Sequence, residues 1–254
     1  MIVEDLDIRV WAALRPIEAV TRRPLDIPLR VRGDGQVWKR NRIGLFVLHE
    51  LHLPAGRREQ FALYERTFEA APAVAPPIEI AATIEDQRGV LLPRRVGIVL
   101  PRADTAAPGV LPPLFEPIDV ALYPAAHAPL AAPWAVVRAH VSRGGQPAAG
   151  CALTVHEPGD ETRILGRGQS DERGEAIVAV AGVPAFIPSG GPEAFVRERT
   201  AALTVVFEIG AAGIGADPPD TDRLAAATGP GFARATVAIV IASGRETSQA
   251  IDLP

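Results

Sequence analysis

The stretch that decides the fold is GQPAAGCALTV, from Gly145 to Val155, followed by SDERGEAIV, from Ser170 to Val178. In both, a polar turn leads into an apolar run of strand length. An Asp or Asn side chain bonds the backbone of such a turn, and Gly supplies the positive φ that completes it. The two stretches therefore predict short strands joined by tight turns and buried in a β-sheet core.

A weaker copy of this pattern lies in the first half of the chain. RPLDIPLRV, from Arg23 to Val31, resembles QPAAGCALTV, from Gln146 to Val155, if one inserted residue is allowed. NRIGLFV, from Asn41 to Val47, then takes the place of the Ser170–Val178 turn. Two copies of one supersecondary pattern predict two similar sandwiches in tandem.

Alternating apolar residues and turn residues continue along the rest of the chain, which contains 23 Gly and 25 Pro. Their spacing favours antiparallel β-sandwiches over alternating strands and helices. A short helix is expected at 221–227, with Thr221 or Asp220 as its N-cap. Trp11 and Trp134 open matching strands and are expected in the core. Strands are expected at 8–14, 25–31, 43–51, 61–68, 78–84, 118–123, 134–141, 152–156, 163–166, 176–180, 203–209, 235–242 and 246–253.

The segment 124–133 (PAAHAPLAAP) contains no charge and predicts a semi-rigid spacer. The predicted organisation is an N-terminal sandwich over 1–123, this linker, and a C-terminal sandwich over 134–254. The fold class is thus all-β, with two tandem antiparallel, Ig-like sandwiches and long Pro/Gly-rich loops. Loops of this length are expected to contact partners, and they cover 102–116, 182–197 and 210–231.

Charge and composition narrow the classes of partner. The chain has 26 Lys+Arg against 30 Asp+Glu, a net charge of −4, which gives no electrostatic reason to expect nucleic acid. No apolar run reaches the 18 residues of a membrane span. The N-terminus lacks the features of a signal peptide, and the single cysteine, Cys151, cannot form an internal disulfide. We therefore expect a cytoplasmic location.

The frame G-x-P-x-x-G-x-x-L-x-V followed by S-D-x-x-G-x-x-x-V, in Gly145–Val155 and Ser170–Val178, resembles the carboxypeptidase regulatory-like domains. The resemblance covers about half of the chain and implies a seven-stranded, transthyretin-like sandwich. The first copy departs from the frame, because Arg22-Arg23-Pro24 replaces the usual Thr-Gly-x-Pro and Pro28 stands where Gly is common.

Two such domains with Pro-rich joints also resemble proteins encoded among the genes of phage-tail-like contractile injection systems. This second resemblance implies a non-catalytic structural or adaptor subunit of a multi-protein assembly, without cofactors. Its partners would be other protein subunits or further copies of itself in a homo-oligomer. Such a subunit is made in the cytoplasm and incorporated into a particle released by lysis.

The metal-like patterns lack the spacing that a metal site needs. His49-Glu50-Leu51-His52 is not H-E-x-x-H, and on a strand His49 and His52 point to opposite faces. His140 and His156 lie in neighbouring expected strands that could bring them face to face, but no Cys or carboxylate cluster accompanies them. A solvated acidic loop is the simpler interpretation of Asp217, Asp220 and Asp222, which lack the spacing of a calcium loop.

Nucleotide and nucleophile patterns are equally incomplete. The glycines of Gly210–Gly215 are followed by Pro218-Pro219, whereas a dinucleotide loop continues into a helix. Ser170 belongs to the repeated turn, and Cys151 lies in an apolar strand. We therefore expect no enzyme, no metal site and no cofactor. Arg57-Arg58 and Arg94-Arg95 are interpreted as ordinary turn charges unless folding brings them together.

Surface recognition is the remaining candidate. Trp38 is followed by Lys39, Arg40 and Arg42, which suggests an exposed basic turn that contacts the acidic surface of a partner or a sugar, against the alternative of a solvated hairpin tip. The alternative function is a carbohydrate-binding module that stacks a sugar on Trp38 or Tyr64.

Overall fold

The computed structural model describes residues 10–53, 56, 77–100, 102, 113, 115–130, 133–184, 186–187, 195–196, 198–211, 213–215 and 217–254. Strands dominate these residues, so the predicted all-β class is confirmed. The chain divides into two compact units. Unit 1 comprises Met1–Ile17, Pro24–Ile84 and Val96–Val120, and unit 2 comprises Glu18–Arg23, Glu85–Arg95 and Ala121–Pro254.

These units differ from the predicted division at the expected spacer, 124–133. Unit 2 begins its main segment at Ala121, and Ala125 is buried in a small apolar cluster with Leu92 and Ile214. The backbone also forms an isolated bridge between Leu91 and Pro124. Small apolar side chains pack closely when a surface is available, so the uncharged composition here marks burial instead of a solvated connector.

Unit 1 contains a four-stranded and a three-stranded sheet. The first has the order β3 (Gln36–Arg40), β4 (Phe46–Leu51), β1 (Ala13–Glu18) and β7 (Ile118–Leu122), and the second has the order β2 (Leu29–Arg32), β5 (Ile78–Asp86) and β6 (Arg94–Leu100). Alternate residues of these strands form the core, as the period of two requires. The fully buried ones include Leu14, Leu48, Ile84, Ile98 and Val120, and Trp11 is buried as predicted.

Two strands of unit 1 were absent from the sequence prediction. β6 has a clear alternation, since Val96, Ile98 and Leu100 are buried, but its opening Arg94-Arg95 suggested a turn. β3 is mostly exposed or half-buried and contains a bulge between Val37 and Trp38. The expected strand at 61–68 lies outside the described residues.

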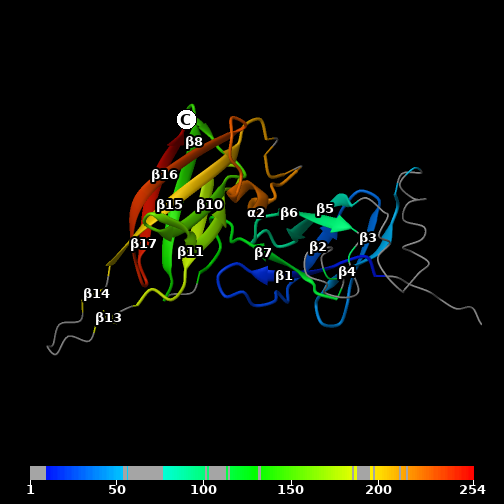
Figure 1. Ribbon diagram of the computed structural model, residues 1–254. Coiled ribbons are helices and arrows are strands. Elements are labelled where there is room, and N and C mark those ends of the chain that lie inside the picture. The colour runs from blue at the N-terminus through cyan, green and yellow to red at the C-terminus, as the bar shows by residue number, and fades with distance from the viewer. Residues whose placement is uncertain are drawn as a thin grey trace, which may run out of the picture. The chain divides into compact units, whose positions relative to one another are not determined.

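Unit 2 is built from two larger sheets around one core (Figure 1). One has the order β11 (Asp160–Gln169), β10 (Ala152–Glu157), β15 (Glu198–Glu208) and β16 (Phe232–Ala242). The other has the order β12 (Glu175–Val180), β8 (Ala135–Arg143) and β17 (Glu246–Leu253), with β9 (Gln146–Pro147) paired to β8. β17 runs parallel to β8, and β13 (Phe186–Ile187) pairs with β14 (Phe195–Val196). Side chains of both large sheets fill one core, so this unit is sandwich-like.

The predicted helix is present as α2 (Thr221–Ala225), and Asp220 is its N-cap. The Asp220 side chain accepts a hydrogen bond from the Arg223 N–H, which satisfies one of the free amides of the first turn. Leu224 packs against Ala152 and Val206, so the helix covers part of the outer face of the four-stranded sheet.

The predicted turn chemistry is confirmed at Asp171. Its carboxylate accepts hydrogen bonds from the N–H groups of Arg173 (2.8 Å) and Glu175 (3.0 Å). Gly174 adopts a φ of 74°. A Cβ at Gly174 would lie 2.2 Å from the Val141 carbonyl oxygen, so this position requires Gly for conformation and for space.

The same turn occurs in unit 1. The Asn41 side chain accepts from the N–H groups of Ile43 (3.1 Å) and Leu45 (2.9 Å), and Gly44 has a φ of 84°. In both turns the side chain of residue i accepts hydrogen bonds from the N–H groups of residues i+2 and i+4, and residue i+3 is a glycine with a positive φ. The turn itself is therefore repeated, although it joins two paired strands of one sheet in unit 1 and strands of different sheets in unit 2.

The two large sheets of unit 2 meet closely on one side. A Cβ at Gly166 would lie 2.8 Å from the Ala179 carbonyl oxygen, and one at Gly168 would lie 2.6 Å from that of Ile177. At these glycines the backbone of β11 therefore lies directly against the backbone and the valine side chains of β12. On the opposite side, β16 ends one sheet and β17 ends the other.

A buried arginine fixes the segment 85–95 within unit 2. Arg94 is 1% exposed, donates to the Ala121 carbonyl (2.7 Å) and forms an ion pair with Asp222. Asp222 also pairs with Arg167 (2.9 Å). The Arg94 guanidinium lies 5.7 Å from the centre of the Tyr123 ring. Arg94 is therefore a buried residue of unit 2 and not an ordinary turn charge. The Asp222 side chain is 51% exposed and pairs with both arginines from the surface.

We predict that Gly174→Ala destabilises the chain much more than Gly159→Ala. Gly159 also has a positive φ, 79°, but a Cβ there meets nothing within 4 Å. The control should therefore cost about 1–2 kcal/mol for backbone strain alone. Gly174→Ala adds the clash with Val141, which raises the cost by about 1–3 kcal/mol. Urea unfolding of both variants measures the difference, and equal costs would contradict the close contact.

We predict that Arg94→Met lowers the free energy of unfolding by about 1–3 kcal/mol, because it leaves the buried Ala121 carbonyl without its hydrogen-bond donor. Arg95→Met is the matched control. Arg95 pairs with Asp217 at 2.8 Å, but both side chains are substantially exposed, so its loss should cost less than about 1 kcal/mol. Thermal and urea unfolding of the two variants test this order.

Candidate functional site

The predicted basic patch at Trp38 is divided by the geometry of β3. Trp38 pairs with Leu48 and Arg40 with Phe46, and both partners are buried, so Trp38 and Arg40 lie on the core-facing side of the strand. Lys39 lies on the opposite side. The three side chains therefore do not form one surface, and binding by them stays a prediction.

Each of these side chains also has a local partner. Arg40 forms an ion pair with Asp26 (3.0 Å) and donates to the Ile27 carbonyl (3.0 Å). Lys39 Nζ lies 3.3 Å from a ring nitrogen of His49. The Trp38 indole N–H donates to Gln36 (2.9 Å). Arg42 is exposed in the turn, and Tyr64 lies outside the described residues.

The suggested face-to-face placement of His140 and His156 is wrong, because they lie in β8 and β10, which belong to different sheets. His140 is exposed on the outer face of the β12–β8–β17 sheet, whereas His156 is 2% exposed in the other large sheet. His156 Nδ1 donates to the Glu157 carbonyl (2.8 Å), which leaves Nε2 to accept from the Thr204 hydroxyl (2.9 Å) in the neutral ring. Thr204 in turn shares a hydrogen bond of 2.8 Å with Thr236.

The two nucleophile candidates are structural. Ser170 is fully buried, accepts from the Cys151 N–H (2.8 Å) and donates to the Ala148 carbonyl (2.8 Å). The Cys151 thiol donates to the same carbonyl (3.2 Å). Burial raises the pKa of Cys151 to about 12, so the reactive thiolate is suppressed.

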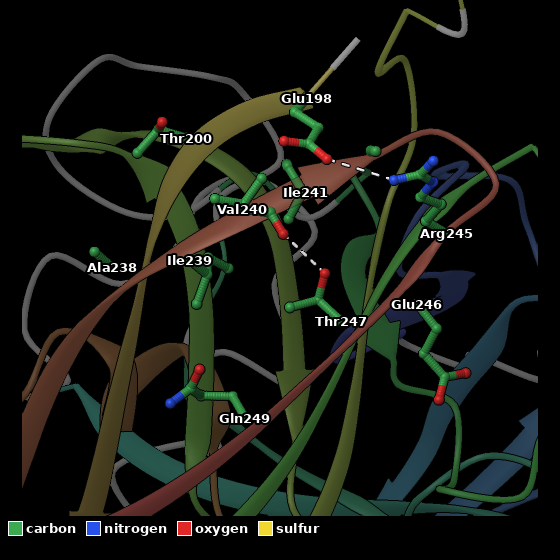
Figure 2. A pocket seen from close by; sticks show the side chains of 11 residues that line it. Glu198, Thr200, Ala238, Ile239, Val240, Ile241, Arg245, Glu246, Thr247 and Gln249 are labelled. Atoms are coloured by element: carbon green, nitrogen blue, oxygen red, sulfur yellow. Dashed lines mark hydrogen bonds and ion pairs between the residues drawn. The ribbon is translucent and has the colours of Figure 1, made fainter. Parts of the chain in front are cut away.

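The open side of unit 2 contains a groove between the last strands of its two large sheets. The groove has a volume of about 480 Å³ (Figure 2). Its walls are the ends of β15 and β16 on one side and the start of β17 on the other. The lining residues are Glu198, Thr200, Ala238, Ile239, Val240, Ile241, Ala242, Arg245, Glu246, Thr247 and Gln249.

The groove exists because the inward-facing residues of β17 are polar in one half of the strand and apolar in the other. Its inward positions are Ile251 and Leu253 in the buried half, but Thr247 and Gln249 in the half that faces the groove. The Thr247 hydroxyl donates to the Val240 carbonyl of β16 (2.8 Å), as Figure 2 shows. Glu198 and Arg245 form an ion pair of 3.4 Å beside it.

β16 presents a long free edge next to this groove. It pairs with β15 over its whole length, from Glu198↔Ala242 to Glu208↔Phe232, without a register shift. Its sequence FARATVAIVIA contains one charge, Arg234, and no Pro or Lys. Edge strands are ordinarily protected by charges, Pro or bulges, so this edge has little protection against pairing with another strand.

The hydrogen bond of Thr247 shows which backbone N–H and C=O groups of β16 point to its free edge. Because the Val240 carbonyl accepts from β17, it points away from β15. Backbone groups alternate along a strand, so those of Ala238, Thr236 and Arg234 also point to the free edge. Among the residues that the structure describes, none pairs with β16 on that side. This arrangement can bind an extended polypeptide.

A second hollow, of about 430 Å³, lies on the outer face of the β12–β8–β17 sheet. Arg138 at this hollow is already engaged, because it pairs with Glu246 (2.8 Å) and donates to the Ala126 carbonyl (2.7 Å). His140 and Glu175 stand opposite one another on neighbouring strands. The hollow offers fewer free polar groups than the β16 edge.

We predict that Cys151 resists a thiol reagent such as DTNB in the folded chain and reacts fully in urea, because the raised pKa keeps it protonated. The thiol ionises in the unfolded chain above its ordinary pKa of 9.0 but not in the folded chain below about 12. The wild type should therefore lose stability relative to Cys151→Ala as the pH rises from 9 towards 12. Rapid labelling of the folded chain at pH 8 would contradict the buried thiol.

Within the described part of the chain, no helix is long and apolar enough to cross a membrane, and no group of three or more His, Cys, Asp or Glu is placed to hold a metal ion. The chain as a whole matches no family model, no curated protein and no solved structure.

Proposed function

We propose that this chain is a non-catalytic structural or adaptor subunit of a multi-protein assembly. The observation that supports this most directly is the β16 edge beside the groove, a long and regular edge with little protection. An isolated protein with such an edge is prone to pair with other chains, whereas a subunit uses it for assembly. The reactive side chains considered above, Ser170 and Cys151, have structural hydrogen bonds that account for them.

The proposal includes a finer description of the fold, two tandem sandwiches of the Ig-like or transthyretin-like kind with carboxypeptidase regulatory-like character. The shared turn at Asn41 and Asp171 supports a duplicated unit. A phage-tail-like contractile injection particle, loaded in the cytoplasm and released by lysis, is the assembly that the resemblance favours.

A carbohydrate-binding module has less support. Sugar stacking needs an open aromatic face, and Trp38 lies on the core-facing side of β3 with its indole N–H already donated to Gln36.

We predict that the full chain, coexpressed with the proteins encoded beside it, forms a complex of fixed stoichiometry by size-exclusion chromatography with light scattering. Val240→Lys should weaken the complex at least tenfold, because Val240 is 46% exposed at the edge. Val99→Lys is the matched control, since Val99 is 42% exposed on β6 of unit 1, and it should assemble normally. A monodisperse monomer that binds none of these proteins, or binding to a glycan array instead, would overturn the proposal.

A further inference from the structure

We infer that the partner supplies an extended segment that adds to β16 as an antiparallel strand and places alternate side chains into the groove. This inference rests on the proposed function and names the kind of contact that the site makes. The site would bind the backbone of an extended peptide through hydrogen bonds. It would select small or β-branched apolar side chains at alternate positions of that peptide.

The backbone groups of the edge define the pairing. Arg234, Thr236 and Ala238 direct their N–H and C=O groups away from β15, and Val240 shares its carbonyl with Thr247. An incoming strand therefore forms its hydrogen-bonded pairs with Arg234, Thr236 and Ala238. β16 has no bulge, so consecutive pairs along it remain in register.

The groove limits which side chains the incoming strand can place on its inward face. Residues of the incoming strand that pair with Thr236 and Ala238 point outward. The neighbouring residue beside Ile239 points inward, over the groove. The inward space is bounded by Thr247 and Gln249 and by the β16 residues from Ala238 to Ala242. A volume of about 480 Å³ with this mixed lining suits Val, Ala or Thr better than a charged side chain.

The charges at the rim are already paired. Glu198 pairs with Arg245 (3.4 Å) and Glu246 pairs with Arg138 (2.8 Å). The rim therefore gives no preference for a charged residue on the segment, and recognition depends on the strand edge and on the groove.

A second copy of the chain fits this site less well than a free segment does. The inward side chains of its own β16, Ile239 and Ile241, are 4% and 1% exposed because they pack in its own core. Those side chains are unavailable to fill the groove of a neighbour. A segment without a core of its own has free side chains on both faces.

The test uses the full chain and the peptide Lys-Thr-Val-Thr-Val-Thr-Val-Lys, in which Val faces the groove when Thr pairs with β16. Two isomers carry N-methyl groups on all Thr or on all Val residues. Methylation of Thr removes the donors that face β16 and should weaken binding at least tenfold by calorimetry. Methylation of Val removes donors that face away and should change binding less than threefold. Equal loss in both isomers, or no binding of the parent peptide, would overturn the inference.

A variant and an exchange measurement complete the test. Ala238→Pro removes an edge-facing N–H without touching the β15 ladder, so it should keep the melting temperature and abolish peptide binding. In the free chain, amides of Thr236 and Ala238 should exchange faster than those of Val237 and Ile239, and the peptide should protect them. Concentration-dependent dimers that Ala238→Pro abolishes would assign the edge to a second copy and overturn the inference.

The two proposals fail in different ways. If a complex with neighbouring proteins forms but the amides of Thr236 and Ala238 still exchange rapidly in it, strand addition is overturned and the structural role stands. If the peptide binds at β16 but no assembly forms, the structural role is overturned and the strand site stands.

Discussion

The organisation of unit 2 depends on the close approach of β11 to β12 at Gly166 and Gly168. Any side chain at these positions would meet a carbonyl oxygen at less than 3 Å. Glycine therefore lets one side of the sandwich close through backbone contact. On the opposite side, β16 and β17 belong to different sheets and are linked by the turn at 243–245 and by the Thr247–Val240 hydrogen bond, and the groove lies there. The groove and the free edge are consequences of this asymmetry.

The clearest similarity between the two units is a turn. Asn41 and Asp171 each hold the N–H groups two and four residues ahead, with a glycine of positive φ at the third position. Asp86 uses the same device, since its carboxylate accepts from Arg88 and Val90 and Gly89 has a φ of 70°. A local motif of five residues thus recurs where strands end, and it was the part of the fold most open to prediction.

Sequence patterns located most strands because burial alternates along them, as in β8 and β17. The same reasoning missed β3, where side-chain exposure hides the period, and it could not connect Arg94 with Asp222, which lie 128 residues apart. It also placed the candidate site at Trp38, because an aromatic residue beside basic residues is visible in a sequence. The free edge of β16 was not visible, since an apolar alternating strand has the same sequence at an edge and at the centre of a sheet. Only the strand order distinguishes them.

The line of polar side chains formed by His156, Thr204 and Thr236 has a consequence for this edge. The three residues come from β10, β15 and β16, and each bonds the next across the sheet. Sliding β16 by one position would turn Thr236 to the other face and leave Thr204 and His156 without that link. These hydrogen bonds therefore fix the register of β16 in its sheet, so that its free edge presents the same backbone N–H groups to a partner.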